Sequence, residues 1–329
     1  MTLSGPPSCL TPFRRRPAAS PRPRVVQIVV TPGSGEGSAL ATARRLRAIL
    51  ARRGHEAAIK EFADLAALTR WATDAPPGLS HVVCVGGDAT LSAAASAAIR
   101  WGTPFVPVPT GFGNVFAQVF GHSNQARAVV RLVEQGEVRY VDVGEVSSEA
   151  GNQVFLSHHS YGFLEQVQEL AERERQQPRR RLWRHLWYYG AAYRFLFRTP
   201  LAAFAVEIDG TRVADDAVLV TVANVETYRG FLTLTPQASP IDGLFDVFIV
   251  PRVSKTILTA RLVRLLLRLP GRWRGGALYR GRRVTVTTPR GQERVVVRRR
   301  ALPLVVPPGA IEALRQRTVD DDAPPVEQP

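Results

Sequence analysis

The sequence predicts an α/β nucleotide-binding domain, built on an open, mostly parallel sheet, followed by a β-sandwich-like domain. Over about 130 residues from Val25, apolar runs of strand length alternate with helical segments, which is the pattern of a parallel sheet covered by helices. After residue 137 the pattern changes to short alternating runs. Turn pairs such as Asp209-Gly210 and Asp242-Gly243 separate these runs, as in a β-sandwich.

The first domain is predicted to span residues 25–137, with each strand leading into a loop and a helix. We expect strands at 25–30, 55–60, 81–85 and 104–108, and helices at 39–53, 64–72, 91–100 and 115–120. Three loops rich in small residues follow strands, at 31–37, 86–90 and 109–114. Ligands of open α/β sheets bind at the carboxyl ends of the strands. These three loops are therefore predicted to form one site.

The second domain is predicted to span residues 138–306 and to be rich in strands. We expect these at 138–143, 154–158, 203–208, 217–223, 232–235, 244–250, 283–287 and 294–298. Helical insertions are expected at 164–197, which is basic and aromatic, and at 254–269, which is amphipathic. Residues 307–317 are expected to return to the first domain. Residues 1–24 and 318–329 have the composition of disordered tails.

The charge composition of the chain favours an anionic binding partner. Lys and Arg total 43 against 28 Asp and Glu, which gives a net charge of +15 and favours an anionic partner such as a nucleotide, an acidic lipid surface or nucleic acid. No run approaches the length of a transmembrane helix. Cys9 and Cys84 lie in a tail and a core strand, so no disulfide is expected. A cytoplasmic protein, peripheral at the inner membrane face, fits these features.

The loop after the third strand has the chemistry of a phosphate site. Gly86 and Gly87 allow the backbone to approach a ligand where a Cβ atom would clash. Asp88 can hold a cation or order a water molecule. Thr90 offers a hydroxyl at the start of a helix, whose N-terminal N–H groups attract anions. Ala89 is the unusual residue, because another small, flexible residue is expected there.

Five motifs in a consistent order resemble the diacylglycerol kinase catalytic family, which includes sphingosine kinases and bacterial lipid kinases. They are Thr31-Pro-Gly-Ser-Gly, Gly86-Gly-Asp-Ala-Thr, Pro109-Thr-Gly-Phe-Gly-Asn-Val-Phe-Ala, the segment 223–230, and the segment 234–246. The resemblance covers about residues 25–315. An NAD kinase would share the Gly-Gly-Asp loop, but the segment 223–246 fits the lipid-kinase branch better.

The resemblance implies a kinase that uses ATP and Mg²⁺ to phosphorylate a lipid hydroxyl. It implies Asp88 as a catalytic residue that serves a metal ion or an ordered water molecule. The residues implied to bind the nucleotide are Thr31, Gly33, Ser34, Gly35, Gly86, Gly87, Asp88, Thr90, Thr110, Gly111, Gly113 and Asn114. Phosphoryl transfer requires a cradle for the phosphates, a metal ion and an aligned acceptor, which these residue types suit.

The chain departs from the family pattern at four places near the implied site, one of which is Leu91-Ser-Ala93, where the family usually carries a glutamate. Ala89 replaces a glycine, at a cost of about 1 kcal/mol if the position requires a positive φ. Val115 replaces an aspartate. The run Arg298-Arg299-Arg300 aligns with the family's Asp-Gly-Glu, whose aspartate is the proposed general base, and the loss of such a base costs about 10²–10⁴-fold in rate.

The family's structural magnesium loop is only partly retained. Asp242 matches a carboxylate and the Leu244 carbonyl is a candidate ligand, but Ser239 stands where a second carboxylate is expected. A weak metal site and a plain Asp-Gly turn are both compatible with this segment. Asn114 likewise suits either a nucleotide contact or a helix N-cap.

Three functions follow from these observations. The first is a lipid kinase of the diacylglycerol kinase type; the second is a catalytically impaired relative that retains nucleotide binding. The third, a nucleic-acid-binding protein, rests on charge alone, and no motif supports it. The basic aromatic segment 179–189 and the leucine stripe at 258–269 suit either an anionic membrane surface or ordinary packing. A homodimer is compatible with the sequence.

Overall fold

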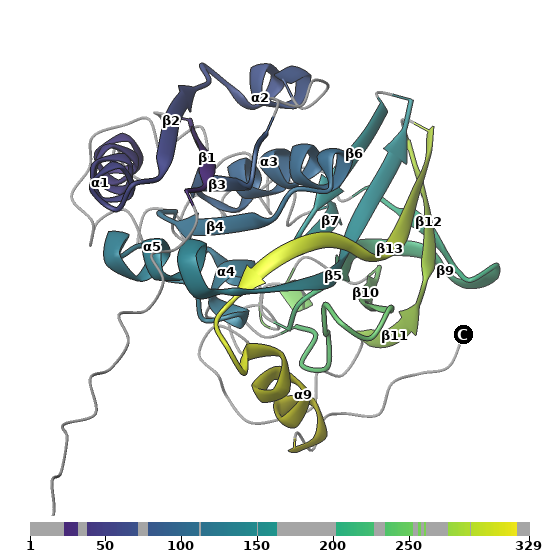
Figure 1. The fold of residues 1–329 in the computed structure, drawn as a ribbon. Coiled ribbons are helices and arrows are strands. Elements are labelled where there is room, and N and C mark those ends of the chain that lie inside the picture. Colours follow the sequence, from purple (N-terminus) through teal and green to yellow (C-terminus); the bar gives the residue numbers. More distant parts are fainter. Residues whose placement is uncertain are drawn as a thin grey trace, which may run out of the picture.

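The computed structural model describes residues 23–31, 38–71, 78–111, 113–149, 151–162, 202–226, 234–252, 256–257, 260, 276–289 and 291–320. Within these residues, a single 13-stranded mixed sheet runs through both domains. Its main path has the order β11-β10-β9-β8-β12-β13-β4-β3-β1-β2. The parallel part carries the helices, and the antiparallel part lies on the other side of β13 (Figure 1).

Four parallel strands form the core of the first domain. They are β1 (Val25–Val30), β2 (Glu56–Glu61), β3 (His81–Gly86) and β4 (Phe105–Pro109). The helices are α1 (Ala39–Arg52), α2 (Leu65–Trp71), α3 (Asp88–Trp101), α4 (Val115–Val119) and α5 (Ala126–Gln135). Side chains of β1 and β3 alternate between two buried layers, one against α1 and α5 and the other against α2 and α3. Because both faces of these strands are buried, their sequences are nearly continuous runs of apolar residues.

The second domain is antiparallel. Its strands are β5 (Glu137–Ser148), β6 (Gly151–Phe155), β7 (His158–Gly162), β8 (Phe204–Ile208), β9 (Thr211–Ala223), β10 (Phe245–Pro251), β11 (Ala277–Gly281), β12 (Arg283–Thr288) and β13 (Gly291–Val306). Alternate residues of these strands form a separate apolar core. The predicted combination of an α/β domain and a sandwich-like domain is therefore confirmed.

Strand β13 joins the two domains. Its first half pairs with β12, its second half runs parallel to β4 with Leu304 opposite Phe105, and β5 pairs along most of its length (Figure 1). Helix α9 (Ala310–Asp320) then packs Ile311 and Leu314 into the core that contains α3. The return to the first domain thus begins within β13, before the predicted segment 307–317, and α9 extends beyond it.

Several predicted elements differ from the structure. Helix α5 and strand β11 were not predicted, and β13 is much longer than the predicted strand 294–298. The predicted helix at 91–100 begins three residues earlier, because Asp88 and Ala89 are helical. Leu234 and Thr235, predicted to lie in a strand, are not in one. Prediction failed here because long strands that change neighbours do not keep one alternating pattern.

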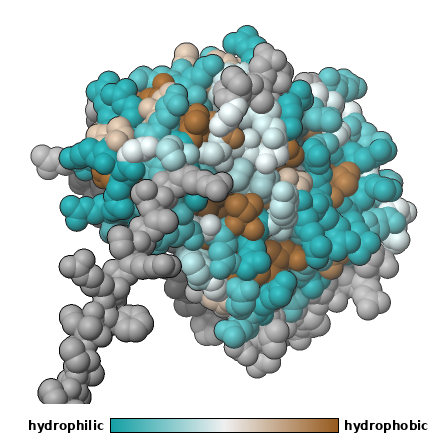
Figure 2. All heavy atoms as spheres, in the orientation of Figure 1, coloured by the Kyte–Doolittle hydropathy of each residue, from teal (hydrophilic) through white to brown (hydrophobic). Residues whose placement is uncertain are grey.

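The surface of the described residues is mainly hydrophilic on the face that Figure 2 shows. On the face in Figure 2, hydrophobic residues form small separate patches among hydrophilic ones. No helix within the described ranges is long and apolar enough to span a bilayer. Cys84 is a free thiol in the core, and burial raises its pKa.

Candidate functional site

The loops after β3 and β4 lie side by side at the carboxyl edge of the parallel sheet. Gly86 is the register partner of Pro109, and the Thr110 N–H donates a hydrogen bond to the Gly86 carbonyl at 3.0 Å. Val30 of β1 is the register partner of Val85, so Thr31 follows at the same edge. The structure therefore brings together the predicted residues of 86–90 and 109–114, with Thr31 beside them. Gly33, Ser34 and Gly35 lie outside the described residues.

Neighbouring atoms leave no room for a side chain at two glycines of these loops. A Cβ atom on Gly111 would lie 2.7 Å from the Gly87 Cα, and one on Gly86 would lie 2.6 Å from the Thr90 Cβ. Neither distance is compatible with ordinary van der Waals contact. None of these glycines has a positive φ. The two loops are thus packed backbone against backbone, with Gly86 buried and Gly87 and Gly111 half-buried.

Asp88 and Asn114 hold the loops in place. The Asn114 N–H donates to Asp88 Oδ2 at 2.9 Å, and Asn114 Oδ1 accepts from the Gly111 N–H at 3.0 Å. Asn114 Nδ2 donates to the Gly111 carbonyl. Asn114 is buried, adopts a left-handed φ of 50° and makes no side-chain capping bond to α4. Asn114 therefore stands at the N-cap position of α4, but its side chain closes the preceding loop and does not cap the helix.

The start of α3 has the properties of an anion site. Gly87 is its N-cap residue, and no side chain caps this end of the helix. The helix is 14 residues long, so its first N–H groups carry the partial positive charge of the helix dipole. Thr90 is buried behind Gly86 and supports the turn. This arrangement can cradle a phosphate group through main-chain N–H donors.

Two departures from the family pattern cause no local strain. Ala89 is exposed in the first turn of α3, and among described non-glycine residues only Asn114, Asp209 and Arg300 have a positive φ. The conformational penalty considered for Ala89 is therefore absent. Val115 is 1% exposed and belongs to the core that includes α3, so its side chain faces apolar neighbours.

The arginine run 298–300 lies at an irregularity of β13, where the register with β5 shifts. Arg298 pairs with Glu145 at 2.9 Å, and Arg300 has a φ of 47°. The Arg300 N–H donates to Asp142 Oδ1 at 2.7 Å, and the Gly243 N–H donates to Asp142 Oδ2 at the same distance. Asp142 is thus a buried anchor that joins β5, β13 and the loop before β10.

Sequence reasoning missed Asp142. It stands between Val141 and Val143 in a predicted strand, and it is 2% exposed. A lone carboxylate within an apolar strand was the available signal, because a buried charge requires partners.

The predicted metal loop does not fit a metal ion as the residues stand. Asp242 Oδ2 lies 2.7 Å from Arg280 Nη2, and Asp246 Oδ1 lies 2.8 Å from Arg280 Nε. The Leu244 N–H donates to Asp242 Oδ1 at 2.9 Å. A guanidinium group therefore already contacts both carboxylates. Within the described residues, no group of three or more acidic, His or Cys side chains is arranged for a metal.

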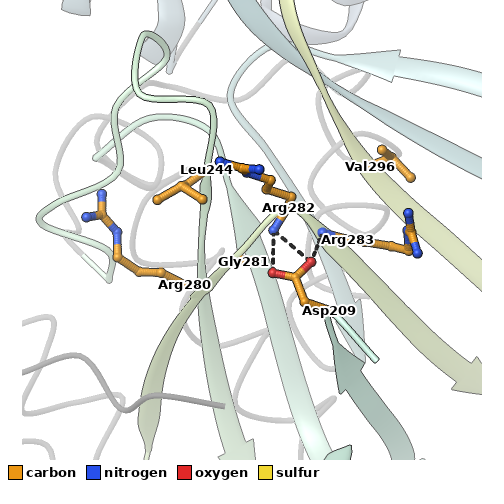
Figure 3. Close-up of a pocket in the computed structure, with 7 residues that line it drawn as sticks. All are labelled: Asp209, Leu244, Arg280, Gly281, Arg282, Arg283 and Val296. Carbon is orange, nitrogen blue, oxygen red and sulfur yellow. Dashed lines mark hydrogen bonds between the residues drawn. The ribbon is translucent and has the colours of Figure 1, made fainter. Parts of the chain in front are cut away.

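Arg280 also borders a surface cavity of about 500 Å³. Its lining residues are Asp209, Leu244, Arg280, Gly281, Arg282, Arg283 and Val296. The Asp209 carboxylate accepts from the N–H groups of Arg282 and Arg283, while the Arg280 side chain extends away from Asp209 (Figure 3). The predicted membrane-binding or packing segments cannot be compared with this cavity, because 179–189 and nearly all of 258–269 lie outside the described residues.

Comparison with known proteins identifies both halves of the chain. Residues 25–146 match the diacylglycerol kinase catalytic domain, and residues 159–299 match the YegS C-terminal NAD kinase beta sandwich-like domain. The resemblance drawn from the sequence motifs is thereby confirmed.

Relatives and solved structures agree with this. A diacylglycerol kinase of Mycobacterium tuberculosis is 29% identical over 245 residues, covering 71% of this chain and 75% of the relative. A probable lipid kinase YegS-like of Pseudomonas putida is 28% identical over 184 residues, covering 55% and 59%. A crystal structure from Bacillus anthracis str. Sterne superposes with a TM-score of 0.68 at 17% identity, covering 90% of this chain and 99% of that one. At that identity the superposition speaks for the fold alone.

Proposed function

We propose that this chain, whose residues 25–146 match the diacylglycerol kinase catalytic domain, is an ATP-dependent lipid kinase. The observation that carries the proposal is the pair of glycine loops packed against each other at the N-terminus of α3. Such a surface suits the phosphates of a nucleotide. The acceptor would be a lipid hydroxyl, reached at the cytoplasmic face of an anionic membrane.

Each residue of the site has a defined task in this proposal. The main-chain N–H groups at the start of α3, directly after Gly87, would cradle phosphate oxygens. Asn114, which accepts from the Gly111 N–H, would keep the two loops in register. Asp88 would hold the magnesium ion of MgATP, because Mg²⁺ is commonly bound by one or two carboxylates together with substrate phosphates. The ion would neutralise charge on the phosphates during transfer.

The missing general base affects rate more than binding. The residues aligned with the family base, Arg298–Arg300, lie in a β-irregularity whose contacts are to Glu145 and Asp142. Phosphoryl transfer depends mainly on positioning and charge stabilisation, so we expect slow turnover. This same observation favours the second candidate, a catalytically impaired relative that binds nucleotide and acts as a binding or regulatory protein.

One experiment distinguishes these functions. Purified protein is incubated with labelled ATP, Mg²⁺ and a mixed lipid extract, alongside Asp88→Ala and Asp88→Asn. Asparagine retains an acceptor for the Asn114 N–H, so it separates the loss of charge from the loss of loop structure. Labelled lipid that disappears in both variants supports the kinase.

Absence of a lipid product, together with retained ATP binding, would contradict the kinase and support the impaired relative. Binding to duplex DNA that is salt-sensitive and tighter than binding to anionic vesicles would instead support the nucleic-acid-binding alternative.

A further inference from the structure

Two oxygen-bearing groups of the loop before β10 and one from the start of β10 converge on one cation. Arg280 Nη2 lies 2.7 Å from Asp242 Oδ2 and 3.2 Å from the Gln237 carbonyl, and Arg280 Nε lies 2.8 Å from Asp246 Oδ1. Two carboxylates and a main-chain carbonyl are ligands that hard divalent cations prefer. Here a guanidinium group, with its fixed fork of donors, takes this position.

The fold places Arg280 there without a loop rearrangement. Arg280 in β11 is the register partner of Asp246 in β10, so the two side chains are cross-strand neighbours. Asp246 is 1% exposed, whereas the side chains of Arg280 and Asp242 are 30% and 28% exposed. The buried carboxylate thus receives a charged partner from the adjacent strand, as a buried charge requires.

The Arg280 guanidinium bonds two carboxylates, and the Asp142 carboxylate also acts on Asp242 as a like charge. The Arg299 side chain packs on the neighbouring Gly243 but bonds neither Asp242 nor Asp246 among the ion pairs of the described residues. Removing Arg280 would therefore leave a strongly acidic cluster that retains its carbonyl ligand. Such a cluster has the donor set of a calcium or magnesium site.

We propose that Arg280 is an internal cation that takes the place of a divalent metal ion in the loop 234–246. The order of this loop is then independent of metal, and the loop becomes a divalent-cation site only when the guanidinium is removed. This inference concerns the second domain and stands whether or not the protein is a kinase.

The consequence reaches beyond the loop itself. The Asp142 N–H donates to the Pro240 carbonyl at 2.8 Å, and the Gly243 N–H donates to the Asp142 carboxylate. A Cβ atom on Gly243 would lie 2.5 Å from Arg299 Nε, so β13 also packs on this loop. Arg280 is therefore a positioning residue for the loop and for the irregular part of β13.

Thermal unfolding of the full chain, without nucleotide, tests the proposal. The wild-type melting temperature should be the same in EDTA as in millimolar Mg²⁺ or Ca²⁺. Arg280→Ala should melt about 5–10 °C lower in EDTA, because it leaves buried charge unpaired, and millimolar Ca²⁺ should restore at least half of that loss. Arg280→Ala/Asp246→Asn should show no such restoration.

Two results would overturn the proposal. One is a wild-type melting temperature that falls in EDTA; the other is an Arg280→Ala protein that does not respond to either cation. If Arg280→Ala does not fold, Ca²⁺ binding by the wild type is compared with that by Asp242→Asn. Equal stoichiometry supports the internal cation, whereas one additional ion bound by the wild type refutes it.

Discussion

The glycine loops of the first domain and the loop 234–246 of the second domain place carboxylates beside tight backbone turns, with opposite results. In the first region, Asp88 accepts from a main-chain N–H, and the nearby Gly86 and Gly111 have no room for a side chain. In the second region, Asp242 and Asp246 both bind Arg280. The first region leaves the start of α3 without a side-chain cap, as the proposed phosphate site requires, whereas the second supplies its own counterion.

This difference follows from what each of the two turns requires. Backbone cradles depend on glycine, because no other residue permits the close approach of Gly87 and Gly111. A carboxylate loop requires only a positive charge, which a metal ion or an arginine can provide. The second motif can therefore lose its ligand and keep its shape.

The largest effect should come from Asp142→Ala, which breaks the anchor of the second region. The change leaves the N–H groups of Gly243 and Arg300 without their charged acceptor. We expect a loss of about 4 kcal/mol in the free energy of unfolding, measured by urea denaturation.

The control for Asp142→Ala is Asp215→Ala, whose side chain is 81% exposed and which should change stability by less than about 0.5 kcal/mol. A similar small loss for Asp142→Ala would show that this carboxylate does not hold the loop.

The next effect should come from Gly111→Ala, which breaks the first region. Its Cβ atom would lie 2.7 Å from the Gly87 Cα, so the two loops must separate. A displacement of this kind should lower kcat/KM for the lipid kinase by about 100-fold. Asn124→Ala, at an exposed position beyond α4, is the control and should leave kcat/KM unchanged. A Gly111→Ala protein with the wild-type kcat/KM would contradict the close-approach argument.

A smaller effect concerns His122, which joins the turn after α4 to strand β13. Its ring Nε2 is 2.8 Å from the Val305 carbonyl of β13, and burial lowers its pKa from 6.5 to about 4. Between these pH values the folded state binds fewer protons than the unfolded state, so stability rises with pH and is lost on acidification. His122 should account for about 2 kcal/mol of the stability lost between pH 7 and pH 5.

The measurement is urea denaturation at several pH values for the wild type and His122→Gln, whose amide retains a donor for Val305. The variant should have a flatter stability profile between pH 4 and 6.5. Other groups with shifted pKa values contribute equally to both proteins, so the difference between the two profiles reports His122 alone. These groups are His81 and His159, whose pKa values burial also lowers to about 4, and Asp246, whose pKa burial raises to about 6. Parallel profiles for the two proteins would refute the role of His122.

Much of the fold was predictable because its parallel strands are buried on both faces. Strand β1 was predicted with its observed bounds, and β3 and β4 within one residue. Strand β11 was missed because its sequence, Ala-Leu-Tyr-Arg-Gly, contains little apolar alternation. The length of β13 was missed because its partners change along the strand, and sequence patterns report burial without identifying neighbours.

The candidate site was predictable where chemistry follows from local sequence. The glycine loops after β3 and β4 lie together because parallel strands end at one edge. The partners of Asp242 were not predictable, because Arg280 is brought to it by strand pairing across a long sequence separation. The role of Asp142 likewise depends on two distant N–H groups.

The smallest effect should come from Ala89→Gly, which restores the residue type of the family pattern in the first region. Ala89 is helical and exposed, so glycine brings no relief of strain and adds conformational entropy to the unfolded chain. We expect a loss of about 0.5 kcal/mol in the free energy of unfolding and a lipid-kinase rate within about twofold of the wild type. Urea denaturation and the labelled-ATP assay measure the two. A tenfold rise in rate would contradict this, because it would mean that the Ala89 methyl group, although unstrained, crowds the space that the phosphates need.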